Sequence, residues 1–143
     1  MRIEGSQGTR HALILGSRTH YYEGKGVRAV AHGVRTAAAA WGGTTTIVDF
    51  AVQRTGERVQ DGLAAWHDKA RGECAIDYAF HQIIGGVDDE SLKAMDELVS
   101  EGITSFKLFM AYPGVFYSDD GQILRAMQTA ANNGSLVMMH AEN

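Results

Sequence analysis

The spacing of hydrophobic residues changes several times along the chain, and each change predicts a new element. Four short runs are rich in β-branched and apolar side chains, as buried strands usually are; they are residues 44–50, 75–84, 103–111 and 135–141. Around and between these runs, apolar residues recur every three or four positions, which is the spacing of one helix face. The pattern therefore predicts strands that alternate with helices.

The predicted helices carry recognisable start and stop signals. Aspartates such as Asp88 stand where a helix N-cap is needed, and glycines such as Gly102 and Gly134 stand where a helix should end. The expected helices are 27–41, 59–70, 88–101 and 118–133.

The four strands begin about 30 residues apart, which is the pace of βαβ units with parallel strands. The fold class is therefore α/β, either an open doubly wound sheet or half of an eight-stranded barrel. No Gly-x-Gly-x-x-Gly follows the first strand, which disfavours dinucleotide binding. Residues 1–32 read as an irregular N-terminal segment, in which only 11–15 suggest a short strand, and residues 33–143 read as the barrel-like domain.

Composition narrows the class of protein. At 143 residues, with 45% hydrophobic and 21% charged residues, the chain is long enough for one globular core. The net charge of −4 gives no general attraction to nucleic acid or to anionic membranes. The single cysteine, Cys74, excludes an internal disulfide framework and fits a reducing compartment. No apolar signal core opens the chain, so we expect a cytoplasmic protein.

Two residues suggest chemistry. Lys107 lies inside an apolar run, where an ammonium group loses its hydration and must be paired, exposed or chemically changed. His140 ends the next apolar run, and histidine is the commonest metal ligand in proteins. Functional residues of parallel α/β folds gather at the carboxyl ends of the strands. Lys107 and His140 together therefore suggest a metal site built across neighbouring strands. The residues that lie late in or just after the four strands, and that we expect to share a cleft, are Asp49, His81, Lys107 with Tyr112, and His140 with Glu142 and Asn143.

Each of these residues also has a plainer structural interpretation. Lys107 could be ion-paired with an acid such as Asp77, and His140 could be a hydrogen-bonded core residue. Tyr112 could end the strand with its hydroxyl in water. Asp49 and His81 also lie late in predicted strands, and we expect hydrogen-bonding structural roles for both.

Three segments resemble the dihydropyrimidinase and D-hydantoinase family, which are cyclic amidohydrolases with a metal-bearing TIM barrel; they are 39–50, 103–112 and 136–143. The resemblance runs from about residue 36 to the end of the chain, with the three motifs in family order. It implies a partial (β/α)8 TIM barrel of about four βα units. It also implies metal-dependent hydrolysis of the cyclic amide C–N bond of dihydropyrimidines or hydantoins.

The same resemblance assigns roles to the candidate residues. Lys107 would be carbamylated by CO2 and bridge two divalent metal ions, usually Zn²⁺, and His140 would bind one of them. Tyr112 would be catalytic, donating its hydroxyl to the oxyanion of the tetrahedral intermediate. The metal ions would acidify a bridging water and polarise the ring carbonyl. The substrate would be a small cyclic amide or imide, and such enzymes are often homotetramers.

The chain also departs from the family pattern. The family carries a His-x-His metal pair that should fall near residues 16–18, where this sequence has Gly16-Ser17-Arg18. The remaining histidine ligand and the catalytic aspartate of the family would come from strands beyond Asn143. We therefore expect a fragment that is inactive and poorly stable alone, with residues 1 to about 32 divergent or read from another frame.

Other classes stay open at this point. One is a non-catalytic relative of the amidohydrolase barrel that serves in interaction or assembly. Another is an unrelated α/β binding module with an ion-paired Lys107. Within the enzyme class, allantoinase and dihydroorotase share the barrel chemistry, although the 109–112 stretch favours the dihydropyrimidinase branch.

Overall fold

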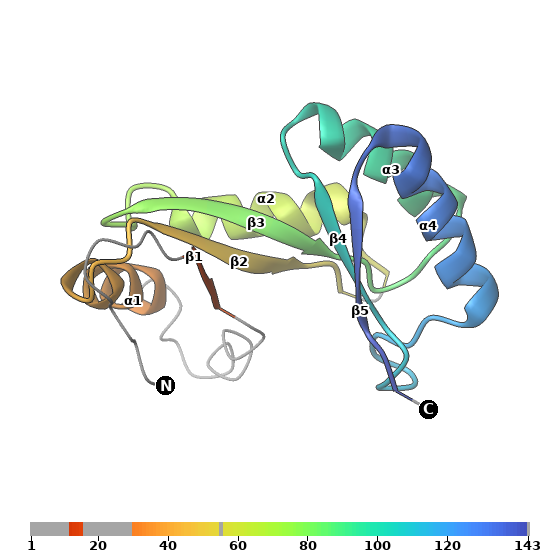
Figure 1. Ribbon diagram of the computed structural model, residues 1–143, viewed down its shortest axis with the longest axis horizontal. Helices are drawn as coiled ribbons and strands as arrows, with labels where there is room; N and C mark the ends of the chain where they lie inside the picture. The colour runs from red at the N-terminus through yellow and green to blue at the C-terminus, as the bar shows by residue number, and fades with distance from the viewer. Residues whose placement is uncertain (1–11, 16–29, 55, 143) are drawn as a thin grey trace. The chain divides into compact units, whose positions relative to one another are not determined.

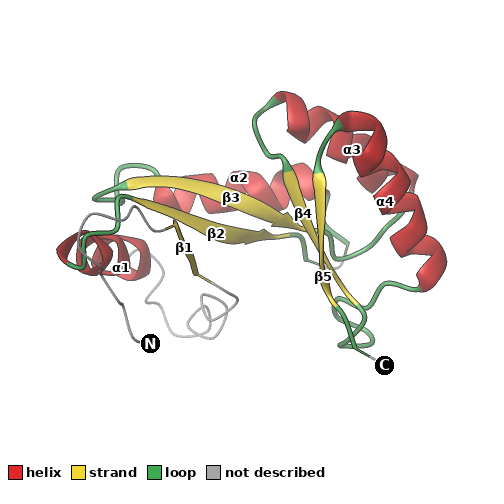
Figure 2. Cartoon of the chain, in the orientation of Figure 1, coloured by secondary structure: helices red, strands yellow, loops and turns green. Residues whose placement is uncertain are grey.

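The structure is a computed structural model that describes residues 12–15, 30–54 and 56–142 (Figure 1). Strands and helices alternate throughout this part of the chain (Figure 2). The elements are β1 Ala12–Leu15, α1 Val30–Trp41, β2 Thr46–Val52, α2 Val59–Ala70, β3 Asp77–Ile83, α3 Asp89–Ser100, β4 Ser105–Phe109, α4 Asp120–Asn133 and β5 Leu136–His140. The strand order is β1-β2-β3-β4-β5.

These elements confirm the α/β prediction, and the four main strands begin and end within two residues of the expected positions. The short strand expected at 11–15 is present as β1, which pairs in parallel with β2. The rest of the segment 1–29 lies outside the described residues. No helix among the described residues is long and apolar enough to cross a membrane.

The chain divides into two compact units, which we describe separately. The first unit contains the described residues up to Phe50 together with 65–80. In it, Ala39 of α1 packs against Ile47 of β2 and Ile76. The side chain of Thr36 accepts a hydrogen bond from the backbone N–H of Ala75 at 3.0 Å, which ties α1 to the start of β3.

The second unit contains residues 51–64 and 81–142, and β4 lies at its centre. On one side β4 pairs in parallel with β3, and on the other it pairs with all five residues of β5. Phe106 and Leu108 on one face of β4 are fully buried, whereas Lys107 on the other face is half-buried. Helix α4 packs on β5 and on α3 (Figure 1). The alternation expected of a strand therefore separates a core face from a face that carries Lys107.

Helix α3 begins at the predicted cap. The carboxylate of Asp88 accepts a hydrogen bond from the backbone N–H of Ser91 at 2.7 Å. Hydrogen bonds from Ser91 lower the pKa of Asp88 below its ordinary value of 3.8. Since the folded-state pKa is lowered, the cap stabilises the fold above pH 3.8 and loses that effect as the pH falls through the lowered value.

We expect Asp88→Ala to lower the free energy of unfolding at pH 7 by about 1 kcal/mol, because the first turn of α3 loses its acceptor. The difference from the parent chain should shrink as the pH falls below 3.8. Urea denaturation at both pH values measures this. Asp88→Asn is the matched control, because it keeps an acceptor but cannot titrate. Equal stability of the alanine variant and the parent at pH 7 would contradict the assigned cap.

Candidate functional site

Lys107 and His140 lie on one face of the β4–β5 pair. In the register of these strands, Lys107 is opposite Met138 and Phe109 is opposite His140. Paired residues of neighbouring strands point to the same face, and so do residues two apart along one strand. Lys107, Phe109 and His140 therefore share a face, with Lys107 in the middle of β4 and the other two at the carboxyl ends of β4 and β5. This is the end of the strands where the sequence analysis expects the site.

The ring of Phe109 lies between the two candidate residues. The Nζ atom of Lys107 is 5.0 Å from the centroid of the Phe109 ring. The same Phe109 ring also stacks on the imidazole of His140, with 5.6 Å between centroids and 26° between planes. Because Phe109 is itself buried, the three side chains form a continuous cluster. We call Lys107, Phe109, Tyr112 and His140 the site cluster.

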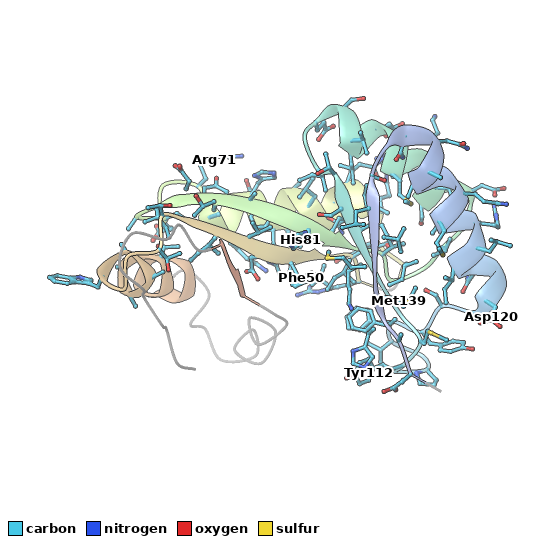
Figure 3. The ribbon with its side chains drawn as sticks, in the orientation of Figure 1. Phe50, Arg71, His81, Tyr112, Asp120 and Met139 are labelled. Atoms are coloured by element: carbon cyan, nitrogen blue, oxygen red, sulfur yellow. The ribbon has the colours of Figure 1, made fainter. Side chains whose placement is uncertain are left out.

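Tyr112 joins this cluster from the segment after β4. Its ring lies 5.6 Å from that of His140 and 5.8 Å from that of Phe109. Figure 3 places Tyr112 just beyond the carboxyl ends of β4 and β5. The side chain is 53% exposed, so its hydroxyl is accessible to a small molecule. The structure thus brings the three predicted site residues together.

Tyr112 has an unusual backbone conformation. Its φ of +64° is the only positive value at a non-glycine position among the described residues. Such a conformation is costly for a bulky side chain and is found where the surroundings hold it in place. Here the carbonyl of Tyr112 accepts hydrogen bonds from three successive N–H groups, those of Val115, Phe116 and Tyr117. The same turn places the Phe116 ring on Phe109, with 5.2 Å between centroids.

The surroundings of Lys107 favour the neutral amine. Removal of water by burial lowers the pKa of Lys107 below its ordinary value of 10.5. Among the described residues no carboxylate forms an ion pair with Lys107. Asp77 belongs to the other compact unit, so the ion pair between Asp77 and Lys107 stays an alternative prediction. Lys107 is the one half-buried residue of β4, between the buried Phe106 and Leu108. Partial burial without a carboxylate suits an amine that reacts with CO2.

His140 is held at its backbone and at one ring nitrogen. Its carbonyl accepts a hydrogen bond from the N–H of Met110 at 2.9 Å, which fixes the end of β5 against the segment after β4. Its Nε2 atom lies 3.4 Å from Oε2 of Glu142, two residues further along. The side chain is 38% exposed, so it is not the enclosed core histidine of the plainer interpretation.

His81 and Asp49 have the structural contacts that the sequence analysis expects. The Nδ1 atom of His81 is 2.5 Å from the hydroxyl oxygen of Ser105, a hydrogen bond that ties β3 to β4. Asp49 belongs to the first unit, is 1% exposed, and accepts a hydrogen bond from the N–H of Phe50 at 2.8 Å. Neither contact places these residues in the site cluster.

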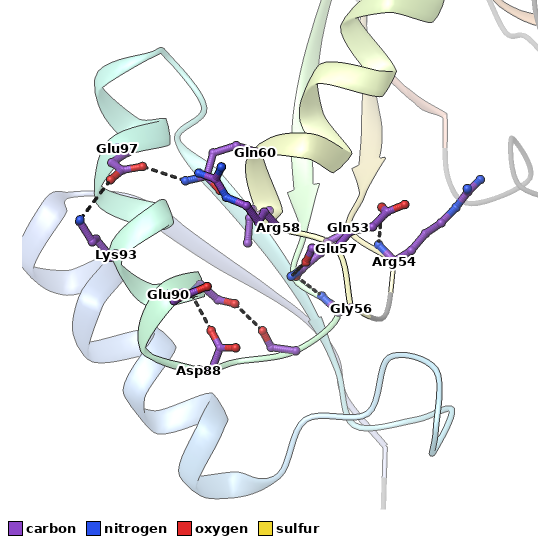
Figure 4. Close-up of a pocket in the computed structure, with 14 residues that line it drawn as sticks. Gln53, Arg54, Gly56, Glu57, Arg58, Gln60, Asp88, Glu90, Lys93 and Glu97 are labelled. Atoms are coloured by element: carbon purple, nitrogen blue, oxygen red, sulfur yellow. Dashed lines mark hydrogen bonds and ion pairs between the residues drawn. The ribbon is translucent and has the colours of Figure 1, made fainter.

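The second unit also contains a hollow that the sequence analysis does not predict. Its volume is about 460 Å³, and it lies between the β2–α2 segment, the β3–α3 segment and α3 (Figure 4). None of the site cluster lines it. Its charged side chains have both signs, with Arg54, Arg58 and Lys93 beside Asp88, Glu57, Glu90 and Glu97, so it selects no class of ion. We therefore place the candidate site at the site cluster and not in this hollow.

Gln53 and Gly85 hold the carboxyl ends of β2 and β3 together, and sequence reasoning missed both. The side chain of Gln53 accepts a hydrogen bond from the N–H of Gly85 at 2.9 Å and donates one to the carbonyl of Glu57 at 2.8 Å. A Cβ atom on Gly85 would lie 2.7 Å from the carbonyl oxygen of Gln53, so only glycine permits this approach. The Gly85-Gly86 pair after a strand was the available signal.

Candidate metal donors are few among the described residues. They contain no group of three or more histidine, cysteine, aspartate or glutamate residues that could hold a metal ion. A catalytic zinc ion normally has three protein ligands. The position expected for the His-x-His pair, 16–18, lies outside the described residues. The available donors are the imidazole of His140 and, if carbamylated, Lys107.

Comparison with known proteins gives several close matches, although no protein-family model matches the chain. The chain is 72% identical over 108 residues to a D-hydantoinase of Streptomyces coelicolor, and 49% identical over 109 residues to one of Geobacillus stearothermophilus. Each alignment covers 76% of this chain and 23% of the relative, so the chain spans about a quarter of the length of these relatives.

A solved structure agrees with the sequence matches. The crystal structure of dihydropyrimidinase from Brevibacillus agri superposes with a TM-score of 0.75 at 44% identity, over 78% of this chain and 24% of that one. The parallel βα units thus correspond to a part of a TIM barrel, which confirms the predicted fold class and decides against the doubly wound alternative.

Proposed function

Because three quarters of the chain is homologous to about a quarter of D-hydantoinase and dihydropyrimidinase, we propose that it is part of a metal-dependent cyclic amidohydrolase. The proposed reaction is hydrolysis of the cyclic amide C–N bond of a hydantoin or a dihydropyrimidine. The observation that carries the proposal is the site cluster, in which Lys107 and His140 share one face of neighbouring strands beside Tyr112.

The donors fit divalent metal ions in kind, although they are too few to complete a site. In the proposed modification, the neutral amine of Lys107 attacks CO2, an N–C bond forms, and one proton leaves the nitrogen for solvent. The resulting carbamate is an anion whose two oxygens suit two cations, and the imidazole of His140 suits Zn²⁺. Bound metal ions would supply an acidified water and polarise the ring carbonyl. Further ligands must come from other residues of the barrel.

The residues of this chain contribute more than ligands. The Tyr112 hydroxyl donates a hydrogen bond to the oxygen of the ring carbonyl as negative charge develops there. The turn at 112–117 holds that side chain in place through three hydrogen bonds on its carbonyl. The Phe109 ring lies against both Lys107 and His140, and the burial of Lys107 favours its neutral amine.

A chimera tests the proposal directly. The residues of this chain that match the Streptomyces coelicolor enzyme would replace the corresponding segment of that enzyme, which is 72% identical over 108 residues. We expect the chimera to hydrolyse hydantoin. Loss of a residue that only supports a metal ligand lowers activity by up to roughly 100-fold. Because Lys107 would itself be a ligand, we expect Lys107→Ala in the chimera to lower the rate of hydrolysis by more than this. Lys93→Ala, an exposed lysine of α3, is the control and should leave the rate unchanged. A folded chimera without activity would refute the proposal.

The 143-residue chain by itself should not hydrolyse hydantoin or dihydrouracil, even with added Zn²⁺. The reason is that its described residues offer two metal donors where three are normally needed. Absorbance assays of ring opening, with the chimera as the positive control, measure this. Turnover by the purified chain, sensitive to Lys107→Ala, would contradict this prediction and show that residues beyond the described donors contribute the ligands that catalysis needs.

The proposal extends to surroundings and assembly. The single cysteine and the ordinary globular composition support a cytoplasmic location. A homotetramer follows from the family resemblance and is checked by analytical ultracentrifugation of the assembled enzyme. A non-catalytic interaction protein is less favoured, because a chain released from catalysis has no need of a partly desolvated lysine such as Lys107, for which the described part of the chain offers no ion-pair partner.

A further inference from the structure

We propose that the hollow beside α3 is a second binding site and that it takes a free amino acid, a small molecule with one carboxylate and one ammonium group. The hollow has a volume of about 460 Å³, within the roughly 300–1,000 Å³ of small-molecule sites in proteins. All the residues that line it belong to the second compact unit, and none of them is in the site cluster. Binding in this hollow therefore does not depend on the proposed hydrolysis.

Most of the charged side chains around the hollow are already engaged within the chain. The Nζ atom of Lys93 lies 3.9 Å from Oε1 of Glu97 (Figure 4). Asp88 caps α3, and the carboxylate of Glu57 accepts a hydrogen bond from the backbone N–H of Arg54 at 3.2 Å. These contacts build the walls of the hollow and use much of its charge.

Arg58 and Glu90 are different, because they line the same hollow with opposite charges and do not pair. Among the described residues neither side chain forms an ion pair. Arg58 precedes α2, whereas Glu90 lies in the first turn of α3, so the two charges come from different walls (Figure 4). Each therefore has a free charge to offer to a bound molecule.

The chemistry of these two groups defines the ligand. A guanidinium binds a carboxylate through parallel N–H···O hydrogen bonds, and a carboxylate accepts hydrogen bonds from an ammonium group. Charges of both signs select no simple anion or cation, but they match a molecule that carries both. An amino acid placed between Arg58 and Glu90 would give each charge its partner.

Gly86 is a second feature that points to a ligand. It lines the hollow, its φ is not positive, and a Cβ atom built on it would meet no heavy atom within 4 Å. The neighbouring Gly85 is different, because its Cβ would lie 2.7 Å from the carbonyl oxygen of Gln53. Neither backbone conformation nor close packing requires glycine at position 86. Its missing side chain leaves room for a bound molecule.

The first test uses leucine as the probe, since analogues that lack either charge exist. We expect the backbone amide signals of residues 86–91 in the ¹⁵N-labelled chain to shift and to saturate as leucine is added. Isocaproate has no ammonium group and isoamylamine has no carboxylate. Each should bind about 10-fold more weakly than leucine, the effect of one charge-assisted hydrogen bond. Equal binding of all three compounds, or no saturable shift with leucine, overturns the proposal.

The second test changes the lining. Arg58→Gln and Glu90→Gln each remove one charge and should each weaken leucine binding by about 10-fold. Glu101→Gln removes an exposed carboxylate of the second unit outside the hollow and is the control. Gly86→Leu adds bulk to the lining and should abolish binding while the far-UV circular dichroism spectrum stays that of the parent chain.

Leucine binding that survives both charge variants overturns the proposal. The titrations use no catalysis and no metal, so they are decided separately from the proposed hydrolysis. An inactive chimera would end the proposed function and leave the binding of leucine in this hollow to be read from the same spectra.

Discussion

Lys107→Ala should abolish the uptake of CO2 by this chain. In the parent chain, incubation with ¹³C-bicarbonate at mildly alkaline pH should give one carbamate signal in the ¹³C spectrum, assigned to Lys107. The reason is that burial lowers the pKa of this amine from 10.5, so its neutral, reactive form is populated at a lower pH than that of an exposed lysine. At a given pH the neutral fraction of an amine rises as its pKa falls, so the lowered pKa favours the form of Lys107 that reacts with CO2.

Two variants make the result specific. Lys93→Ala removes a lysine that is 79% exposed and paired with Glu97, and it should leave the carbamate signal intact. Lys107→Arg keeps a cation and most of the side-chain length, but its guanidinium stays charged at this mildly alkaline pH and cannot form a carbamate. A signal that survives both Lys107 variants, or a parent chain with no signal at any bicarbonate concentration, would remove the chemical basis of the proposed function.

Divalent metal should strengthen the same signal. A carbamate is an anion, so Zn²⁺ bound beside it shifts the equilibrium toward the modified lysine. His140→Ala should reduce this enhancement because one of the two available donors is lost. The measurement is the carbamate intensity with and without Zn²⁺ in the parent and in the variant.

Phe109→Leu should disorganise the site cluster while the chain stays folded. The Phe109 ring is the side chain that the other members of the site cluster pack against. It contacts Lys107, Tyr112, Phe116 and His140. Leucine keeps much of the apolar volume, and such swaps usually cost less than about 1.5 kcal/mol. Leucine has no ring to stack on the imidazole, so the NMR signals of His140 and Tyr112 should shift and broaden.

Phe106 provides the matched control. Phe106 lies on the opposite face of β4 and is 0% exposed. Phe106→Leu should cost a similar free energy of unfolding in urea but leave the signals of His140 and Tyr112 in place. Alanine at either position is expected to cost about 3–5 kcal/mol, a large part of the 5–15 kcal/mol that stabilises a typical domain. Unchanged His140 and Tyr112 signals in Phe109→Leu would show that the ring does not position them.

Local patterns in the sequence were sufficient to predict the helices and strands. The apolar run around Lys107 and the spacing from Val59 to Ala70 each appear as the predicted strand or helix, because both depend on side-chain periodicity. The helix caps were equally predictable. Asp88 caps α3 through a hydrogen bond within the first turn of that helix, and Gly134 ends α4 with a φ of +77°. Errors of up to two residues at strand ends arise where pairing with a neighbour decides the boundary.

The candidate site was predictable in part. Lys107 and His140 stand out because a polar group in or at the end of an apolar run needs an explanation. The partner of Lys107 could not be predicted in the same way, because the order of strands in the sequence does not show which of their side chains meet. An ion pair with Asp77, which belongs to the other unit, stays an alternative prediction. Gln53 gave no signal, since a glutamine becomes structural only when two loops close on it.

By itself the sequence determined the alternation of strands and helices, the parallel α/β class and the kinds of donor available, because these follow from periodicity, propensity and side-chain chemistry within short segments. Only the tertiary structure decided that Phe109 lies opposite His140 and that Tyr112 turns back onto both rings. Strand register and ring orientation depend on contacts between segments about 30 residues apart, and no local pattern encodes which of those contacts pack best.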